Sequence, residues 1–122
     1  MSRPDRIELR GLRVLGVHGV LPEERVKAQP FELDLDLELD LAMAGGSDVL
    51  ADTVDYAGVV DRAGAVISGP GKFQLLEALA EAIAATALAD GRVVSVTVGL
   101  RKLEPPLAAD IATVGVRITR GR

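Results

Sequence analysis

Residues 31–41 read F-E-L-D-L-D-L-E-L-D-L, an unbroken alternation of apolar and acidic side chains. Successive side chains of a β-strand point to opposite faces of its sheet, so this pattern predicts a strand with one buried face and one polar face. The apolar face comprises Phe31, Leu33, Leu35, Leu37, Leu39 and Leu41. The polar face comprises Glu32, Asp34, Asp36, Glu38 and Asp40. We therefore expect a sheet that is covered by other elements on one side and polar on the other.

Three further stretches alternate in the same way and predict three more strands. Residues 6–16 alternate less cleanly, and Gly11 predicts a bulge or kink within them. We expect this stretch to pair with residues 31–41. The other two stretches are residues 93–101, with Val94, Val96, Val98 and Leu100 on one face, and residues 113–120, with Val114, Val116 and Ile118 on one face.

Apolar residues at helical spacing predict two helices between the second and third strands, over residues 56–67 and about 73–89. Thr53 or Asp55 could cap the first helix. The chain of 122 residues then reads strand-strand-helix-helix-strand-strand, with no repeat or linker. We expect a single α+β domain over residues 1–122, in which two helices cover one face of a four-stranded antiparallel sheet.

Two interpretations of the polar sheet face remain open at this point. It could be a solvated outer face, with Arg10, Arg101 and Arg117 available to the acids from neighbouring strands. Alternatively, several sheets could join edge to edge into a barrel whose wet interior this face lines. A barrel would also remove the exposed strand edges of a small open sheet.

Composition excludes several classes of function. The chain has no Cys and one His, so neither a thiolate nucleophile nor a Cys- or multi-His metal site is possible. A net charge of -4 argues against nucleic-acid binding. The apolar stretches are far shorter than a membrane span, and no apolar signal segment begins the chain. We expect a soluble cytoplasmic protein without nucleic-acid or membrane partners.

Five scarce polar residues are candidates for chemistry, and each also has a purely structural interpretation. Lys102 closes a strand, where it could transfer protons or simply be solvated. Tyr56 opens a helix and could be catalytic or a packing residue. Glu77 begins the second helix, where it could complement the helix dipole or accept two parallel N–H bonds from an amidine-like ring edge. Glu24 and His18 lie in a Gly- and Pro-punctuated loop, most simply as a solvated acid and a turn residue bonded to backbone.

Four motifs in the same order strongly resemble the dihydroneopterin aldolase family. They are Gly16-Val17-His18-Gly19-Val20 with Glu24, Asp52-Thr53-Val54-Asp55-Tyr56, Leu75-Leu76-Glu77, and Lys102 with Pro105-Pro106-Leu107. The resemblance implies the tunnelling fold, in which four β-β-α-α-β-β units close into a barrel that stacks as an octamer. It also implies that the five acids of residues 31–41 face the tunnel.

The resemblance further implies a reaction and catalytic roles. Family enzymes cleave 7,8-dihydroneopterin into 6-hydroxymethyl-7,8-dihydropterin and glycolaldehyde, a retro-aldol step of folate synthesis that uses no metal, cofactor or Schiff base. By motif position, Lys102 would be the general acid/base, with its pKa drawn towards neutrality. Tyr56 would relay a proton to the enol-like intermediate. Glu24 would hold the side-chain hydroxyls or a bridging water.

The pterin-binding residues follow from the same motifs. Glu77 would anchor the amidine edge of the ring, assisted by backbone groups around Leu76. Val54 and Tyr56 would approach the substrate from the neighbouring subunit, so the site would exist only in the homo-oligomer.

Two alternative functions remain. Residues 102–110 look partly like the sister epimerases that act on dihydroneopterin triphosphate, and re-addition after cleavage would invert a side-chain carbon. The chain could also be a ring-forming assembly protein that keeps the fold without activity.

Overall fold

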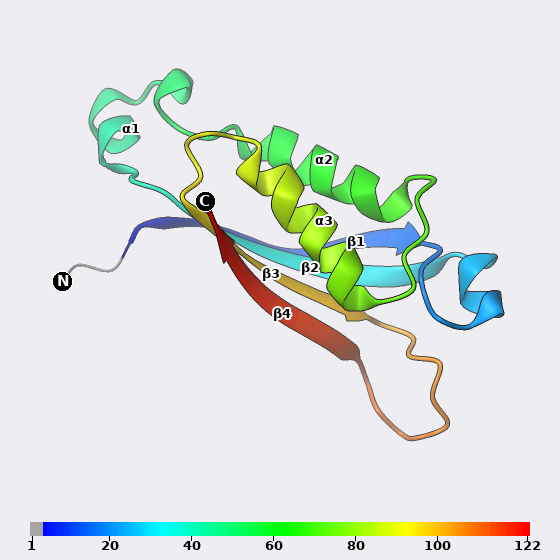
Figure 1. Ribbon diagram of the computed structural model, residues 1–122. Coiled ribbons are helices and arrows are strands. Elements are labelled where there is room, and N and C mark those ends of the chain that lie inside the picture. Colours follow the sequence, from blue (N-terminus) through cyan, green and yellow to red (C-terminus); the bar gives the residue numbers. More distant parts are fainter. Residues whose placement is uncertain (1–3) are drawn as a thin grey trace.

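The computed structural model describes residues 4–122, and four strands form one antiparallel sheet within it (Figure 1). The strands are β1 (Arg6–Gly16), β2 (Gln29–Glu38), β3 (Ser95–Lys102) and β4 (Val114–Gly121). Their order across the sheet is β1-β2-β3-β4. The predicted pairing of the first two strands is therefore confirmed, and β2 and β3 are the central strands.

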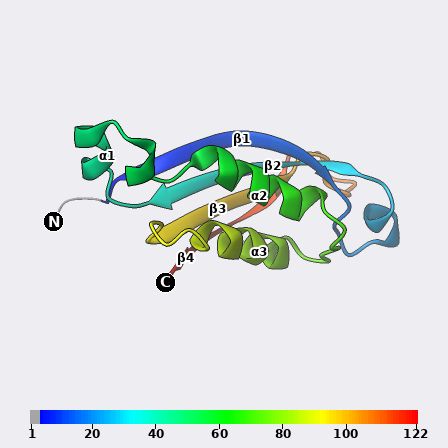
Figure 2. The ribbon, with the colours of Figure 1, turned by 90° about the horizontal axis from the view of Figure 1, so that it is seen from above.

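Two helices, α2 (Tyr56–Ser68) and α3 (Leu76–Leu88), lie side by side on one face of this sheet (Figures 1 and 2). α2 packs over β1, and α3 packs over β3 and β4. Both predicted helices are thus confirmed, and Asp55 is the residue that caps α2. Three short helical segments were not expected: η1 (Pro22–Arg25), α1 (Ala42–Ser47) and η2 (Leu50–Asp52). No helix within residues 4–122 is both long and apolar enough to cross a membrane.

The core lies between the helices and the apolar face of β2. The β2 residues Phe31, Leu33, Leu35 and Leu37 are all buried, and the helices cover them with Val59, Ala63, Ile67, Leu79 and Ile83. Burying one such leucine or isoleucine side chain stabilises the fold by about 2 kcal/mol. The alternation of residues 31–37 thus determines which sheet face receives the helices.

The ends of two predicted strands differ from expectation. β2 ends at Glu38, and Asp40 instead accepts a hydrogen bond from the backbone N–H of Ala42 at 2.8 Å, at the start of α1. Asp40 is therefore not part of the acidic sheet face. β3 begins only at Ser95, so Val94 is exposed and Val93 is buried in its place.

Gly11 forms the predicted bulge in β1. Its φ of 72° lies in the left-handed region that favours glycine, and the register of β1 against β2 shifts between Leu9 and Leu12. The bulge turns the Gly11 N–H toward β2, where it donates to Asp34 Oδ1 at 2.7 Å. The irregularity thus contributes a hydrogen bond to the acidic face.

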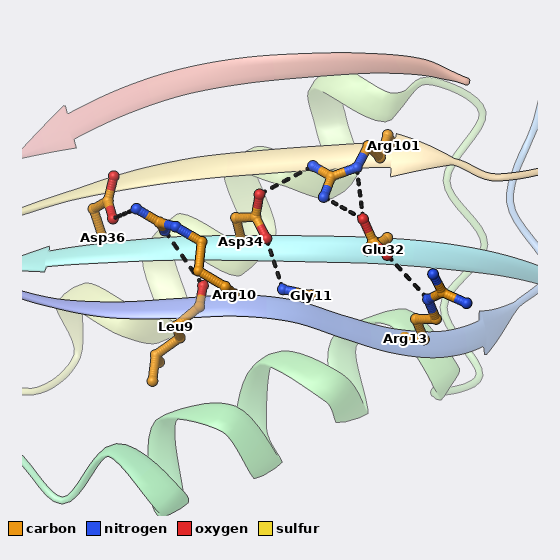
Figure 3. A network of polar contacts seen from close by, with 8 residues as sticks. All are labelled: Leu9, Arg10, Gly11, Arg13, Glu32, Asp34, Asp36 and Arg101. Carbon is orange, nitrogen blue, oxygen red and sulfur yellow. Dashed lines mark hydrogen bonds and ion pairs between the residues drawn. The ribbon is translucent and has the colours of Figure 1, made fainter. Parts of the chain in front are cut away.

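Arg101 of β3 connects two acids of β2 on the polar face of the sheet (Figure 3). Its Nε donates to Glu32 at 2.9 Å and its Nη1 to Asp34 at 3.1 Å. Arg13 of β1 donates to the other oxygen of Glu32 at 3.0 Å. Hydrogen bonds from Arg101 and then Arg13 hold the pKa of Glu32 below its ordinary value. Burial alone would raise the pKa of Asp34, but the Gly11 N–H and Arg101 outweigh burial and lower it.

A second ion pair lies further along the same face. Arg10 Nη2 of β1 is 2.7 Å from Oδ1 of Asp36, which is buried although it projects from the uncovered side. The Asp36 carboxylate at this distance raises the pKa of Arg10 further above its ordinary value. Three acids of this face, Glu32, Asp34 and Asp36, are therefore paired with arginines from the two neighbouring strands. Arg117, which shares this face, forms no ion pair within the described part of the chain.

Replacing Arg101 by Met should flatten the acid dependence of stability. The lowered pKa values of Glu32 and Asp34 contribute stability above the ordinary carboxyl pKa, and this contribution is lost as the pH falls through the native values. Arg101→Met should therefore lower the free energy of unfolding near neutral pH, and this loss should shrink as the pH falls below the ordinary carboxyl pKa and Glu32 and Asp34 become protonated. Urea unfolding across this pH range measures both effects.

The matched control is Arg117→Met, which removes a cation from the same sheet face without breaking an ion pair of the described chain. It should leave the pH profile nearly unchanged. A loss for Arg101→Met that is equally large at all pH values would show that packing, not the ion pairs, explains it.

Candidate active site

The connection between β1 and β2 carries a carboxylate that is buried rather than solvated. Glu24 lies in η1 and is 2% exposed. Its Oε1 accepts a hydrogen bond from the backbone N–H of Leu21 at 3.3 Å. The interpretation of Glu24 as a solvated loop acid is therefore wrong, because the loop folds back over the end of the sheet and encloses this side chain.

Lys102 is the partner of Glu24. It is the last residue of β3, and the register places it beside Phe31 at the beginning of β2. Its Nζ lies 2.7 Å from Glu24 Oε2, and its side chain is 13% exposed. The simple interpretation of Lys102 as a solvated end-of-strand lysine is wrong for the same reason. An amine and a carboxylate enclosed together form a unit that can hold and transfer a proton.

Gly19 makes the enclosure of Glu24 possible. Its φ of 155° is a conformation that side chains other than glycine rarely adopt. A Cβ atom at this position would overlap the carboxyl group of Glu24. The backbone of the loop can therefore lie directly against the carboxylate only because residue 19 has no side chain.

A pocket of about 380 Å³ opens beside the ion pair. Glu24 and Lys102 are its charged residues, and its remaining wall consists of Val20, Leu21, Pro106, Leu107 and Val114. Pocket sites of this kind combine an apolar wall with a few converging polar groups. The sequence motifs include most of these residues. Leu21 and Val114 lie outside the motifs, and an apolar side chain in a loop or at a strand end does not by itself predict a place in a pocket wall.

The first turn of α3 lies at the same end of the molecule as the end of β3 (Figure 1). Glu77 is in this turn and is exposed. The residue before the helix, Leu75, is extended and provides no side-chain cap, so the first N–H groups of α3 are available to a ligand. Leu76 and Glu77 therefore offer donors and an acceptor side by side.

Val54 and Tyr56 lie elsewhere. Tyr56 is the first residue of α2 and is 57% exposed, whereas Val54 is buried. Ile67, near the other end of α2, contacts the loop that carries Glu24, through its carbonyl and His18. At 1.5 Å per helical residue, Tyr56 is about 17 Å from Ile67 along the helix. One chain thus brings together Lys102 and Glu24 near the start of α3 and keeps Tyr56 away from them.

Among residues 4–122, no three His, Cys, Asp or Glu side chains are placed to bind one metal ion. The sheet covered by two helices, with a lysine–carboxylate pair in a pocket at its end, defines a class of small α+β domain equipped for proton transfer to a bound molecule.

Comparisons with known proteins identify the family. The FolB dihydroneopterin aldolase family model matches residues 7–119. The dihydroneopterin aldolase of Methylorubrum extorquens is 43% identical over 119 residues, which cover 97% of this chain and 91% of that protein. The chain belongs to the dihydroneopterin aldolase family, whose members are lyases that catalyse a retro-aldol cleavage.

Solved structures agree with this assignment. The E. coli dihydroneopterin aldolase in complex with neopterin superposes with a TM-score of 0.87 at 32% identity, covering 96% of this chain and 99% of that one. A Burkholderia dihydroneopterin aldolase bound to guanine gives a TM-score of 0.80 at 29% identity, covering 98% and 92%. The chain accordingly has the fold of one β-β-α-α-β-β unit of the tunnelling fold that the sequence motifs implied.

Gly19→Ala should disrupt the Glu24–Lys102 pair. The new Cβ overlaps the Glu24 carboxyl and adopts an unfavourable φ, so we expect a loss of about 1–3 kcal/mol in the free energy of unfolding. Gly45→Ala is the matched control, since nothing lies within 4 Å of its Cβ position in α1. It should be neutral or slightly stabilising. Chemical denaturation compares the two variants, and equal behaviour would contradict the role of Gly19.

Proposed function

We propose that this chain cleaves 7,8-dihydroneopterin into 6-hydroxymethyl-7,8-dihydropterin and glycolaldehyde without a metal, and that Lys102 and Glu24 carry the proton transfers. The observation that carries this proposal is the enclosed pair of Lys102 Nζ and Glu24 Oε2, 2.7 Å apart at the wall of a pocket. A retro-aldol cleavage needs a group that removes a hydroxyl proton and a sink for the electron pair of the broken bond. The ring imine of the dihydropterin is such a sink.

Lys102 is positioned to act as the general acid/base. The proton leaves the hydroxyl on the carbon that becomes the aldehyde, and the electrons of the adjacent C–C bond move into the ring. Glu24 then holds the side-chain hydroxyls or a bridging water, because its carboxylate also faces the pocket. A proton returned to the carbon that remains on the ring completes 6-hydroxymethyl-7,8-dihydropterin, and Tyr56 is the relay that we propose for this step.

Glu77 is the proposed anchor for the pterin ring. Its exposed carboxylate can accept two parallel N–H bonds from an amidine-like edge, and the uncapped N–H groups near Leu76 can bind the neighbouring ring atoms. Neopterin and guanine, the ligands in the two related structures, both contain an aminopyrimidinone ring, which presents such an amidine-like edge. The common edge supports recognition by a carboxylate at the start of α3.

Val54 and Tyr56 are proposed to reach the substrate from a neighbouring subunit. The separation of Tyr56 from Lys102 within one chain supports this for Tyr56. Val54, whose side chain is buried, would contribute through its backbone. Copies joined through β1 and β4, the two edge strands of the described sheet, would form a tetrameric ring with the acidic face inside, stacking as an octamer. We place this oligomer in the cytoplasm, which fits a chain without cysteine.

The pocket favours cleavage over epimerisation of the triphosphate. A triphosphate needs several cations, but among residues 4–122 the one cation lining this pocket is Lys102, which is already paired with Glu24. Epimerisation of unphosphorylated dihydroneopterin would use the same residues, so product analysis has to separate it from cleavage.

Lys102→Ala and Glu77→Ala should affect different kinetic steps. Removing the general acid/base should lower kcat by about 100- to 10,000-fold with little change in pterin affinity. Removing the anchor should weaken binding by about 10- to 100-fold, the equivalent of a lost charge-assisted pair. The assay resolves the products of 7,8-dihydroneopterin by chromatography with a chelator present, and calorimetry measures pterin binding.

Several outcomes would contradict the proposal. Release of an epimerised pterin alone would make the chain an epimerase, and activity lost on chelation would make the reaction metal-dependent. An unchanged pterin affinity in Glu77→Ala would remove the anchor assignment. No turnover of dihydroneopterin or its triphosphate would favour an assembly protein without activity.

Mixed oligomers test the shared site. Lys102→Ala and Tyr56→Ala should each be nearly inactive alone. If each site takes Lys102 from one subunit and Tyr56 from the next, random co-assembly leaves about one quarter of the sites with both residues, and activity returns to about that fraction. No recovery in a verified mixed oligomer would place both residues in sites built by one chain.

A further inference from the structure

We propose that His18 is a positioning residue that holds the Glu24 loop and the start of α3 in a fixed relation through a neutral imidazole. The inference rests on the proposed function, because it concerns how the two halves of that site are aligned. His18 does not line the pocket, so it acts through Glu24 and α3 and not on the substrate.

The hydrogen bonds of His18 fix its protonation state. The side chain is 2% exposed, with Nε2 lying 2.6 Å from the carbonyl oxygen of Ile67. The backbone N–H of Phe73 donates to Nδ1 at 3.1 Å. A carbonyl can only accept and an N–H can only donate, so Nε2 carries the hydrogen and Nδ1 the lone pair. The imidazole is therefore neutral, and both of its nitrogens are used.

The surrounding residues leave the imidazole no other position. Its ring meets Phe31 edge-on with centroids 5.5 Å apart, and Phe73 at 5.6 Å on a tilted plane. A Cβ on Gly16 would lie 2.9 Å from the imidazole and 2.8 Å from the Ile67 carbonyl oxygen. Glycine at position 16 is thus needed for the imidazole to reach the end of α2.

Residues 18 and 19 together clamp the backbone of Phe73. His18 accepts its N–H, and the N–H of Gly19 donates to its carbonyl at 2.9 Å. Gly19 lies directly against the carboxyl group of Glu24, and Glu77, in the first turn of α3, follows shortly after Phe73 in the chain. The clamp therefore connects the acid/base pair to the proposed ring anchor, two groups that must engage one substrate together.

The two hydrogen bonds of His18 have separable consequences. The bond to Ile67 satisfies a carbonyl in the last turn of α2, which is a contribution to stability. The bond to Phe73 sets the distance between the Glu24 loop and α3, which is a contribution to turnover. An error of about 1 Å in such alignment can cost about 100-fold in rate.

Two variants distinguish these contributions. In His18→Asn the side-chain oxygen stands where Nδ1 was and can accept the Phe73 N–H, but nothing reaches Ile67. In His18→Gln the side-chain nitrogen can donate to Ile67 as Nε2 does, but the acceptor for Phe73 is lost. We expect His18→Asn to keep kcat within about threefold of the unsubstituted oligomer with a lowered Tm. His18→Gln should keep more of the Tm and lose about tenfold or more in kcat.

The control is Val96→Ala, which removes buried volume from β3 far along the strand from Lys102. It should lower the Tm without changing kcat. Binding of 6-hydroxymethyl-7,8-dihydropterin by calorimetry is the second readout, and its affinity should change less than threefold in either His18 variant, because the ring anchor itself is intact.

A merely structural His18 would give a different result. The inference is overturned if kcat in the two variants falls in step with Tm, or if His18→Gln retains full kcat. Failure of the proposed function is recognised separately, since the unsubstituted oligomer would then not cleave 7,8-dihydroneopterin in the same assay.

Discussion

The burial of one face of β2 is the constraint on which the remaining structure depends. Phe31 and the leucines that follow it require the cover that α2 and α3 supply, and the same alternation sends the acids to the opposite face. β2 is paired on both sides, so its register against β3 also determines where β3 ends. That register sets Lys102 beside Phe31, where the loop entering β2 carries Glu24. The position of the Lys102–Glu24 pair is thus a consequence of core packing.

Enclosing the Glu24–Lys102 ion pair stabilises this end of the sheet less than apolar residues could. Removing two charges from water costs several kcal/mol per ion, and apolar residues of similar volume often do as well or better. Three features nevertheless surround the pair. Gly19, with a positive φ, lies against the Glu24 carboxyl, the backbone N–H of Leu21 donates to it, and both charged residues line the pocket. By contrast, the arginine–carboxylate contacts on the polar face of the sheet connect adjacent strands and are partly exposed to solvent. The two sets of ion pairs therefore differ in their surroundings: the Glu24–Lys102 pair is enclosed at a pocket, whereas the arginine pairs neutralise acids on the polar face of the sheet.

The sequence predicted most of the fold because the relevant signals are local. Alternation over residues 31–37, a glycine in β1 and helical spacing after Tyr56 each depend on a few neighbouring residues. The strand ends were less predictable. Asp40 lies beyond the end of β2 and accepts a hydrogen bond from the backbone N–H of Ala42, and Val94 lies just before β3 begins at Ser95. The burial of Glu24 could not be read from its own surroundings, because its partner lies 78 residues away. From the sequence, only the resemblance to a known family predicted that Glu24 and Lys102 lie in the same site, and the structure places them in contact.

Two features of a single chain favour association with further copies. The edge strands of the described sheet have no neighbour on their outer side, and Tyr56 lies far from Lys102. An isolated four-stranded sheet leaves β1 and β4 with unpaired backbone groups along one side each, which favours pairing with another chain. Tyr56 exposes a large ring at the start of α2, about 17 Å of helix away from the end that meets the Glu24 loop. Joining copies edge to edge satisfies the strand edges, and the same joining can bring the α2 start of one copy to the pocket of the next. With the proposed roles, a monomer would hold Lys102, Glu24 and Glu77 but would lack Tyr56 of a neighbouring copy, so assembly of the chains would also complete the proposed site.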